Sequence, residues 1–267
     1  MMTRATHYSR TLAAKADRPD CQGYVCWGAI LWLGALMPAA AADRIPTNAP
    51  IAYLEQQLAQ ARRQQAAAPD SAAAASQLAR ACFYRAEFPT NDNHRATLAR
   101  EGIAVARVAV TNDASHAAAH YYLAMNLGQL ARTKSLGALS LVKVMEQEFH
   151  QALALDEQLD YAGPDRYLGR LYFEAPAALS VGSRTNARKH LTRAARLQPD
   201  YPENRLNLIE SALRWKETKT ARKEAEHYAA ALAAARAKLN GEAWQAAWLD
   251  WDARWDKART ALKLAQP

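Results

Sequence analysis

Two histidines, one helical turn apart, are the first residues in this 267-residue chain that could do chemistry. His116 and His120 are separated by three alanines, and an i,i+4 pair of imidazoles on one helix can hold a metal ion. The glutamate of an H-E-x-x-H motif is missing, however, and no third ligand is evident. We therefore expect His116 near a helix start and His120 packed beneath Tyr121 and Tyr122. The sequence predicts no metal site and no cofactor.

Patterns typical of catalysis are weak elsewhere in the chain. Residues 163–166 (GPDR) lack the lysine and the glycine spacing of a phosphate-binding loop. There is no G-x-S-x-G motif, and no serine or cysteine has a plausible histidine partner near it. Asp165 and Glu174 lie on one short helix, but nothing beyond the presence of two carboxylates suggests general acid–base catalysis. We expect both on a solvated face. The sequence therefore predicts that the protein is not an enzyme.

Side chains suited to recognition are a sharper candidate. Arginine offers a forked donor, tyrosine offers rigid contact area and methionine packs adaptably. Arg166 and Arg170, one helical turn apart, could bind a carboxylate of a peptide or ligand; alternatively, Arg166 pairs internally with a carboxylate such as Asp156 or Glu157. In a curved array of helix hairpins, the first helix of each hairpin lines the concave face. This rule predicts a ligand- or partner-binding wall made of Arg80, Tyr84, Tyr121, Met125, Arg166, Arg170 and Phe173.

The composition predicts that helices position these residues. Half of the residues are apolar, with alanine supplying many of them, glycine is scarce and long alternating Val/Ile/Thr runs are absent. An alanine-rich chain with 22% charged residues indicates an all-α protein. Of the formal net charge of +8, about +2 lies in residues 1–42 and about +6 is spread along the expected helices among residues of both signs. The concentrated basic stripe of a nucleic-acid-binding surface is missing. We expect no nucleic-acid partner.

Small and bulky residues recur at repeating positions from about Leu78 to Leu232. The clearest unit is 161–206, where Leu168-Gly169-x-x-Tyr172 on one helix is followed by a second helix with Ala187, Leu191, Ala194 and Leu197 on one face. Such interlocking is typical of a tetratricopeptide repeat (TPR) hairpin. The four expected hairpins pair 71–88 with 94–111, 115–132 with about 138–156, two helices within 161–197, and 202–216 with 218–239. The prediction is a TPR-like α-solenoid over 71–240, in which each hairpin contacts only its neighbours.

The N-terminal segment resembles a secretory signal peptide. Residues 1–42 contain a basic head, an apolar run over 24–37 and four alanines before Asp43. Cleavage after Ala42 would place the mature protein in the periplasm without stable membrane insertion, although a retained anchor is the alternative. We expect a tether over 43–50 and an N-terminal cap helix over 51–70. Cys82 would then be the one cysteine of the mature chain, so no intrachain disulfide can form, and we expect a buried, inert thiol.

The C-terminal segment, 241–267, is expected to be a Trp-rich cap helix. Four tryptophans fall on one helical face and must pack against something: Trp244, Trp248, Trp251 and Trp255. They could cap the last repeat, form a subunit or partner interface, or touch a membrane surface. Asp250 and Arg254 are expected to point away from that face.

Several motifs taken together suggest a narrower likeness. They are 120–124 (HYYLA), 162–172 (AGPDRYLGRLY), Ala175-Pro176, Ser180-x-Gly182 and 199–206 (PDYPENRL). Over roughly 75–216 the chain resembles the TPR-type T component associated with TRAP transporters, but it lacks a lipoprotein cysteine at the cleavage site. The resemblance implies a periplasmic, self-associating helical protein that docks an extracytoplasmic solute-binding protein and passes an apolar ligand through a channel. The first functional prediction is therefore an exported scaffold for a transport-associated protein partner. The alternative is a carrier that holds an apolar small molecule between its helices.

Overall fold

The computed structural model describes residues 48–134 and 137–264, so the predicted signal peptide and most of the predicted tether lie outside the described residues. Within these ranges the chain forms ten α-helices and no strand, which confirms the prediction of an all-α protein. The helices are α1 (Asn48–Ala67), α2 (Ala72–Ala86), α3 (Asp92–Asn112), α4 (Ala117–Ala131), α5 (Ala138–Leu155), α6 (Leu159–Glu174), α7 (Arg184–Leu197), α8 (Pro202–Arg214), α9 (Thr218–Lys238) and α10 (Glu242–Leu262).

Several helices begin where a polar side chain caps the first free amides. Ser71, Asn91 and Ser183 precede α2, α3 and α7, and each side chain accepts a hydrogen bond from the amide three residues on. Pro202 occupies the first turn of α8, where its missing N–H costs nothing. These local signals mark the starts of α2, α3, α7 and α8.

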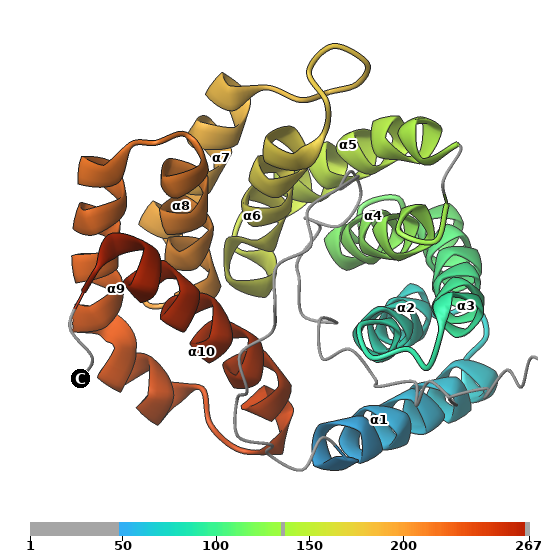
Figure 1. The fold of residues 1–267 in the computed structure, drawn as a ribbon. Coiled ribbons are helices and arrows are strands. Elements are labelled where there is room, and N and C mark those ends of the chain that lie inside the picture. The colour runs from blue at the N-terminus through green and yellow to red at the C-terminus, as the bar shows by residue number, and fades with distance from the viewer. Residues whose placement is uncertain (1–47, 135–136, 265–267) are drawn as a thin grey trace, which may run out of the picture.

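The helices pack as consecutive pairs: α2 with α3, α4 with α5, α6 with α7, and α8 with α9. The first members of the pairs also touch in turn, α2 to α4, α4 to α6 and α6 to α8. The unpaired helices complete the circuit, because α1 packs on α2, α10 packs on α8 and α9, and α1 packs on α10 (Figure 1). We call this circuit of α1, α2, α4, α6, α8 and α10 the closed array.

Contact between α1 and α10 departs from the sequence prediction. A quasi-linear solenoid would keep its two ends apart, since each hairpin would touch only its neighbours. Here the curvature of the four pairs brings the ends together, and α10 is packed on three helices rather than one. The contact between α1 and α10 therefore closes the circuit of helices around the interior.

The largest buried cluster among the described residues runs through the first three helix pairs, α2 to α7. Phe149 of α5 is fully buried, stacks on Tyr167 of α6 with ring centroids 6.0 Å apart, and lies equally far from Tyr121 of α4. A second cluster joins α8, α9 and α10 around Trp251. Cys82 is buried as expected, and burial raises the pKa of its thiol to about 12, which keeps it protonated and unreactive.

Close approach of α3 and α4 depends on Gly102. A Cβ at this position would lie 2.3 Å from Oδ1 of the buried Asn126, whose Nδ2 donates to the carbonyls of Ala79 at 2.9 Å and Tyr122 at 2.8 Å. Gly102→Ala is therefore expected to destabilise the protein by about 1–2 kcal/mol, because overpacking outweighs the gain in helix propensity.

Urea denaturation followed by circular dichroism measures this effect. In an Asn126→Ala background the same change should cost nothing or stabilise, since the obstructing side chain is gone. An equal loss in both backgrounds would contradict the packing explanation.

Candidate ligand-binding site

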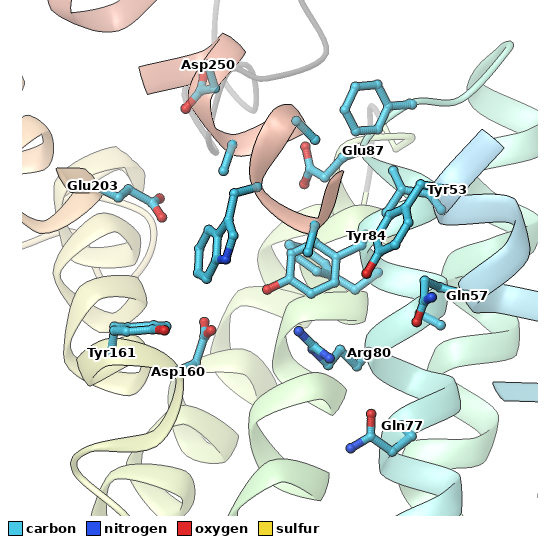
Figure 2. A pocket seen from close by; sticks show the side chains of 18 of the residues that line it. Tyr53, Gln57, Gln77, Arg80, Tyr84, Glu87, Asp160, Tyr161, Glu203 and Asp250 are labelled. Atoms are coloured by element: carbon cyan, nitrogen blue, oxygen red, sulfur yellow. The ribbon is translucent and has the colours of Figure 1, made fainter. Parts of the chain in front are cut away.

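A cavity of about 640 Å³ lies inside the closed array (Figure 2). Its lining comes from α1, α2, α6, α8 and α10, together with Tyr201 immediately before α8. One side presents amides and a guanidinium from α1 and α2, together with Glu87, whose carboxylate pairs with Arg132 and Gln129. The other side presents carboxylates from α6, α8 and α10. Volumes of roughly 300–1,000 Å³ are usual for small-molecule sites. The cavity is therefore large enough for an organic ligand.

A left-handed turn at the start of α6 points two residues into the cavity. Asp160, Tyr161 and Ala162 have φ values of 49°, 57° and 62°, a conformation that costs an L-residue about 1–2 kcal/mol. Arg166 Nη1 donates to the carbonyls of Asp160 and Tyr161, each at 3.0 Å. Asn204 Nδ2 of α8 donates to the Tyr161 carbonyl at 3.1 Å. The turn is thus held by side chains rather than by local preference, as is common at functional sites.

Arg166 forms the centre of the carboxylate side of the cavity. It is 1% exposed, with Nη2 2.7 Å from Asp160 Oδ2 and Nε 3.2 Å from Glu203 Oε2. Tyr121 donates from its hydroxyl to the same Asp160 oxygen at 2.6 Å. Arg166 therefore pairs internally, but with Asp160 and Glu203 rather than with Asp156 or Glu157. Its guanidinium is not offered to a ligand.

Four aromatic side chains form one surface beside these charges, which we call the aromatic wall. Tyr161 stacks on Tyr201 with ring centroids 4.5 Å apart and planes 9° apart. Trp251 meets Tyr201 edge-on at 5.3 Å, and Trp244 meets Tyr161 edge-on at 5.8 Å. All four residues line the cavity. The wall is therefore rigid and preformed.

The tryptophans of α10 are divided between packing and lining. Trp251 is buried, whereas Trp244, Trp248 and Trp255 are half-buried. Trp255 packs on Tyr228 of α9 at 4.6 Å, and Trp248 packs edge-on against Trp251 at 4.9 Å. The tryptophan face of α10 thus packs against other helices of the same chain along much of the helix.

Asp250 is a buried carboxylate that lines the cavity. It is 7% exposed, and Arg254 Nη1 lies 3.2 Å from its Oδ2. Burial raises the pKa of Asp250 to about 7; Arg254 acts in the opposite direction, and the carboxylates of Glu203 and Glu210 add to the rise. Asp250 and Arg254, which the helical spacing places off the tryptophan face, are nevertheless buried, because α10 packs on α1, α8 and α9.

Stability should report the titration of Asp250. Its pKa is 3.8 in a reference peptide and about 7 when folded, so its favourable contribution is complete below about pH 4 and is lost as the pH rises to about 7. Asp250→Asn should therefore reduce the fall in the free energy of unfolding across this window, measured by urea denaturation at several pH values. The exposed Asp256→Asn is the control and should follow the wild-type curve. Parallel curves for Asp250→Asn and wild type would contradict the assignment.

On the opposite side of the cavity, Arg80 of α2 lies over the ring of Tyr84 at 5.3 Å from the ring centroid. No carboxylate lies within 4.0 Å of its guanidinium in the described parts of the chain. Gln57 and Gln77 line the same side (Figure 2). Arg80 thus contrasts with Arg166, which has two carboxylate partners.

The seven residues expected on one wall are not all brought together. Arg80, Tyr84 and Arg166 line the cavity. Tyr121 and Met125 are buried in the core. Arg170 lies 3.3 Å from Glu174 and 3.0 Å from Glu210, while Phe173 meets Trp215 edge-on at 5.6 Å. The four outside the lining are used in packing between helices.

The remaining candidates for chemistry are structural. His120 is buried, with Nδ1 2.6 Å from Glu148 Oε2 and Nε2 3.0 Å from the Ala114 carbonyl. His116 occupies the N-cap position of α4, but its side chain makes no capping hydrogen bond. Asp165 is wrongly placed by the sequence on a solvated face: it is fully buried against His190 at 2.8 Å and also pairs with Arg193.

In residues 48–134 and 137–264, no group of three or more His, Cys, Asp or Glu side chains could hold a metal ion. Across the same ranges, none of the helices combines the length and apolar character needed to cross a bilayer. A scan against protein-family models gives no match, and neither does a comparison with curated proteins.

Sequence reasoning missed most of the cavity lining, including five of its polar and aromatic residues: Asp160, Tyr161, Tyr201, Glu203 and Asp250. Signals for four of them were present. Asp160 and Tyr161 immediately precede the helix-breaking Gly163-Pro164 pair, and Tyr201 and Glu203 fall within the 199–206 motif. Nothing local marks Asp250, because its burial depends on the closure of the array.

Proposed function

We propose that the protein is a non-catalytic, TPR-like solenoid that binds a small molecule in its central cavity. The observation that carries this proposal is that the first and last described helices, α1 and α10, both contribute to the lining of one cavity that also holds the buried carboxylates of Glu203 and Asp250 and the exposed guanidinium of Arg80. Burying an ionised group is costly unless it is paired, so charges aimed into a cavity favour a ligand that pairs with them. An exported protein of this kind would hold its ligand in the periplasm.

The test is native mass spectrometry of the protein purified under mild conditions. Ala247 lines the cavity, and Ala247→Trp should fill part of it. The wild type is expected to carry a non-covalent small molecule that Ala247→Trp loses. Ala178→Trp, at an exposed position between α6 and α7, is the matched control and should keep the ligand. Absence of a bound compound, together with no stabilisation of the wild type by a metabolite library, would contradict the proposal.

A second candidate function is the accessory role that the family resemblance implies, in which the protein docks an extracytoplasmic solute-binding protein of a TRAP-type system. The observation that favours it is the projecting connection between α6 and α7 (Figure 1), where Leu179 is 74% exposed. An apolar side chain held in solvent on a projecting loop suits a protein contact.

Pull-down from periplasmic extract tests this second function. Leu179→Glu should lose a captured solute-binding protein. Leu155→Glu, at an exposed apolar position on α5, should retain it. Equal capture by the two variants would argue against docking through this loop.

A further inference from the structure

We propose that the cavity binds a small organic zwitterion, with its ammonium group towards Asp250 and the aromatic wall and its carboxylate towards Arg80. This inference rests on the proposed small-molecule function and specifies the chemistry of the ligand. It follows from an excess of opposite charge on two sides of one cavity.

The negative side carries one carboxylate more than its arginines balance. A continuous network of ion pairs connects Asp160, Glu203, Asp250, Glu210 and Glu174 with Arg166, Arg254, Arg170 and Arg214. It therefore holds five carboxylates and four guanidiniums. A proton on Asp250 would compensate the difference, and burial raises the pKa of that residue to about 7.

Asp250 is the carboxylate of this network that is least well paired. Its partner Arg254 also donates to Glu210 at 2.7 Å and to Asn207 at 2.6 Å. In the described ranges, Arg254 at 3.2 Å is the only polar partner of Asp250. A ligand ammonium beside Asp250 would replace the proton and bring the network to neutrality.

The aromatic wall is also suited to bind the ammonium group of the ligand. The negative face of an aromatic ring attracts an ammonium or a quaternary nitrogen, most strongly for tryptophan. Arg166 already lies over Tyr201, 4.8 Å from its centroid. Tyr161 and Trp244, both half-buried and in the lining with Asp250, remain to receive a cation.

The positive side is Arg80. Arg166 is neutralised by Asp160 and Glu203, so Arg80 is the arginine of the lining that lacks a carboxylate within 4.0 Å among the residues that the structure describes. Its planar fork can bind a carboxylate through two hydrogen bonds. Arg80 lies on α2 and Asp250 on α10, and Figure 2 shows them at different ends of the lining. A ligand that satisfies both must carry both charges.

Isothermal titration calorimetry with the full chain tests this inference. The probes are the standard amino acids and glycine betaine, each compared with the matching amine that lacks the carboxylate and the matching acid that lacks the nitrogen. At least one zwitterion should bind about tenfold or more tightly than both of its fragments, since each fragment loses one charge-assisted contact. Its affinity should rise with pH up to about 7, as Asp250, facing Arg254, Glu203 and Glu210, loses its proton.

Variants assign the two ends of the ligand. Arg80→Met should weaken the zwitterion about tenfold and leave the matched amine unchanged, whereas Asp250→Asn should weaken the zwitterion and the amine and abolish the pH dependence. Arg63→Met, exposed on α1 outside the lining, should change neither. Tight binding of an amine or an acid alone would contradict the proposal that the ligand is a zwitterion, but it would remain consistent with the proposed small-molecule function. Failure of all probes, with no co-purifying compound, would overturn both.

Discussion

Replacing Arg166 by methionine is expected to lower the free energy of unfolding by about 3–5 kcal/mol, because it leaves buried carboxylates without their partner. Arg166 is 1% exposed and lies 2.7 Å from Asp160 and 3.2 Å from Glu203. It also holds the left-handed turn through two backbone carbonyls, so the strain in that turn would lose its main support.

Urea denaturation followed by circular dichroism measures the loss. The control is Arg188→Met, because Arg188 pairs with Glu217 on the surface, at 44% side-chain exposure, and should contribute about 0–1 kcal/mol. Adding Asp160→Asn and Glu203→Gln to Arg166→Met should restore much of the stability by removing the orphaned charges. Equal losses for Arg166→Met and Arg188→Met would show that the buried pairs contribute little.

Trp251→Ala should cost a similar amount, about 3–5 kcal/mol, through the cavity that it creates between α8 and α10. The indole is 2% exposed and contacts Tyr201 at 5.3 Å and Trp248 at 4.9 Å. Because α10 contacts α1, loosening α10 should also increase amide hydrogen exchange in α1.

Chemical denaturation and hydrogen exchange check the two parts of this prediction. Trp251→Phe should retain part of the stability, since it keeps an aromatic side chain at the contact. Leu179→Ala, at a position 74% exposed, should change the free energy of unfolding by less than about 0.5 kcal/mol. If Trp251→Ala leaves amide hydrogen exchange in α1 unchanged, the contact with α10 does not stabilise α1.

Helices could be predicted because their signals are local. Apolar periodicity and small residues mark faces such as the one with Ala187, Leu191 and Ala194, which are all buried. The left-handed turn could not be predicted in this way. Asp160 and Tyr161 have no intrinsic preference for that conformation, and the partner that holds it from α8, Asn204, is distant in sequence.

The burial of charged residues was even harder to predict from local sequence patterns. Sequence patterns assign a lone aspartate to solvent, yet Asp165 and Asp250 are buried because other helices or turns supply partners and cover. Arg80, Tyr84 and Arg166 were predictable as lining residues, since they stand on the first helices of the first and third helix pairs. The contribution of α10 was not predictable, because it arises only when the chain ends meet.

We propose that one ligand occupies the cavity that α1 and α10, the first and last described helices, help to line. Hydrogen exchange with and without the tightest-binding probe tests it most directly. The account predicts simultaneous protection in the lining segments 53–64, 77–88, 160–167 and 243–251, with α5 and α9 unchanged. Protection confined to one segment, or found mainly on α5 and α9, would contradict it.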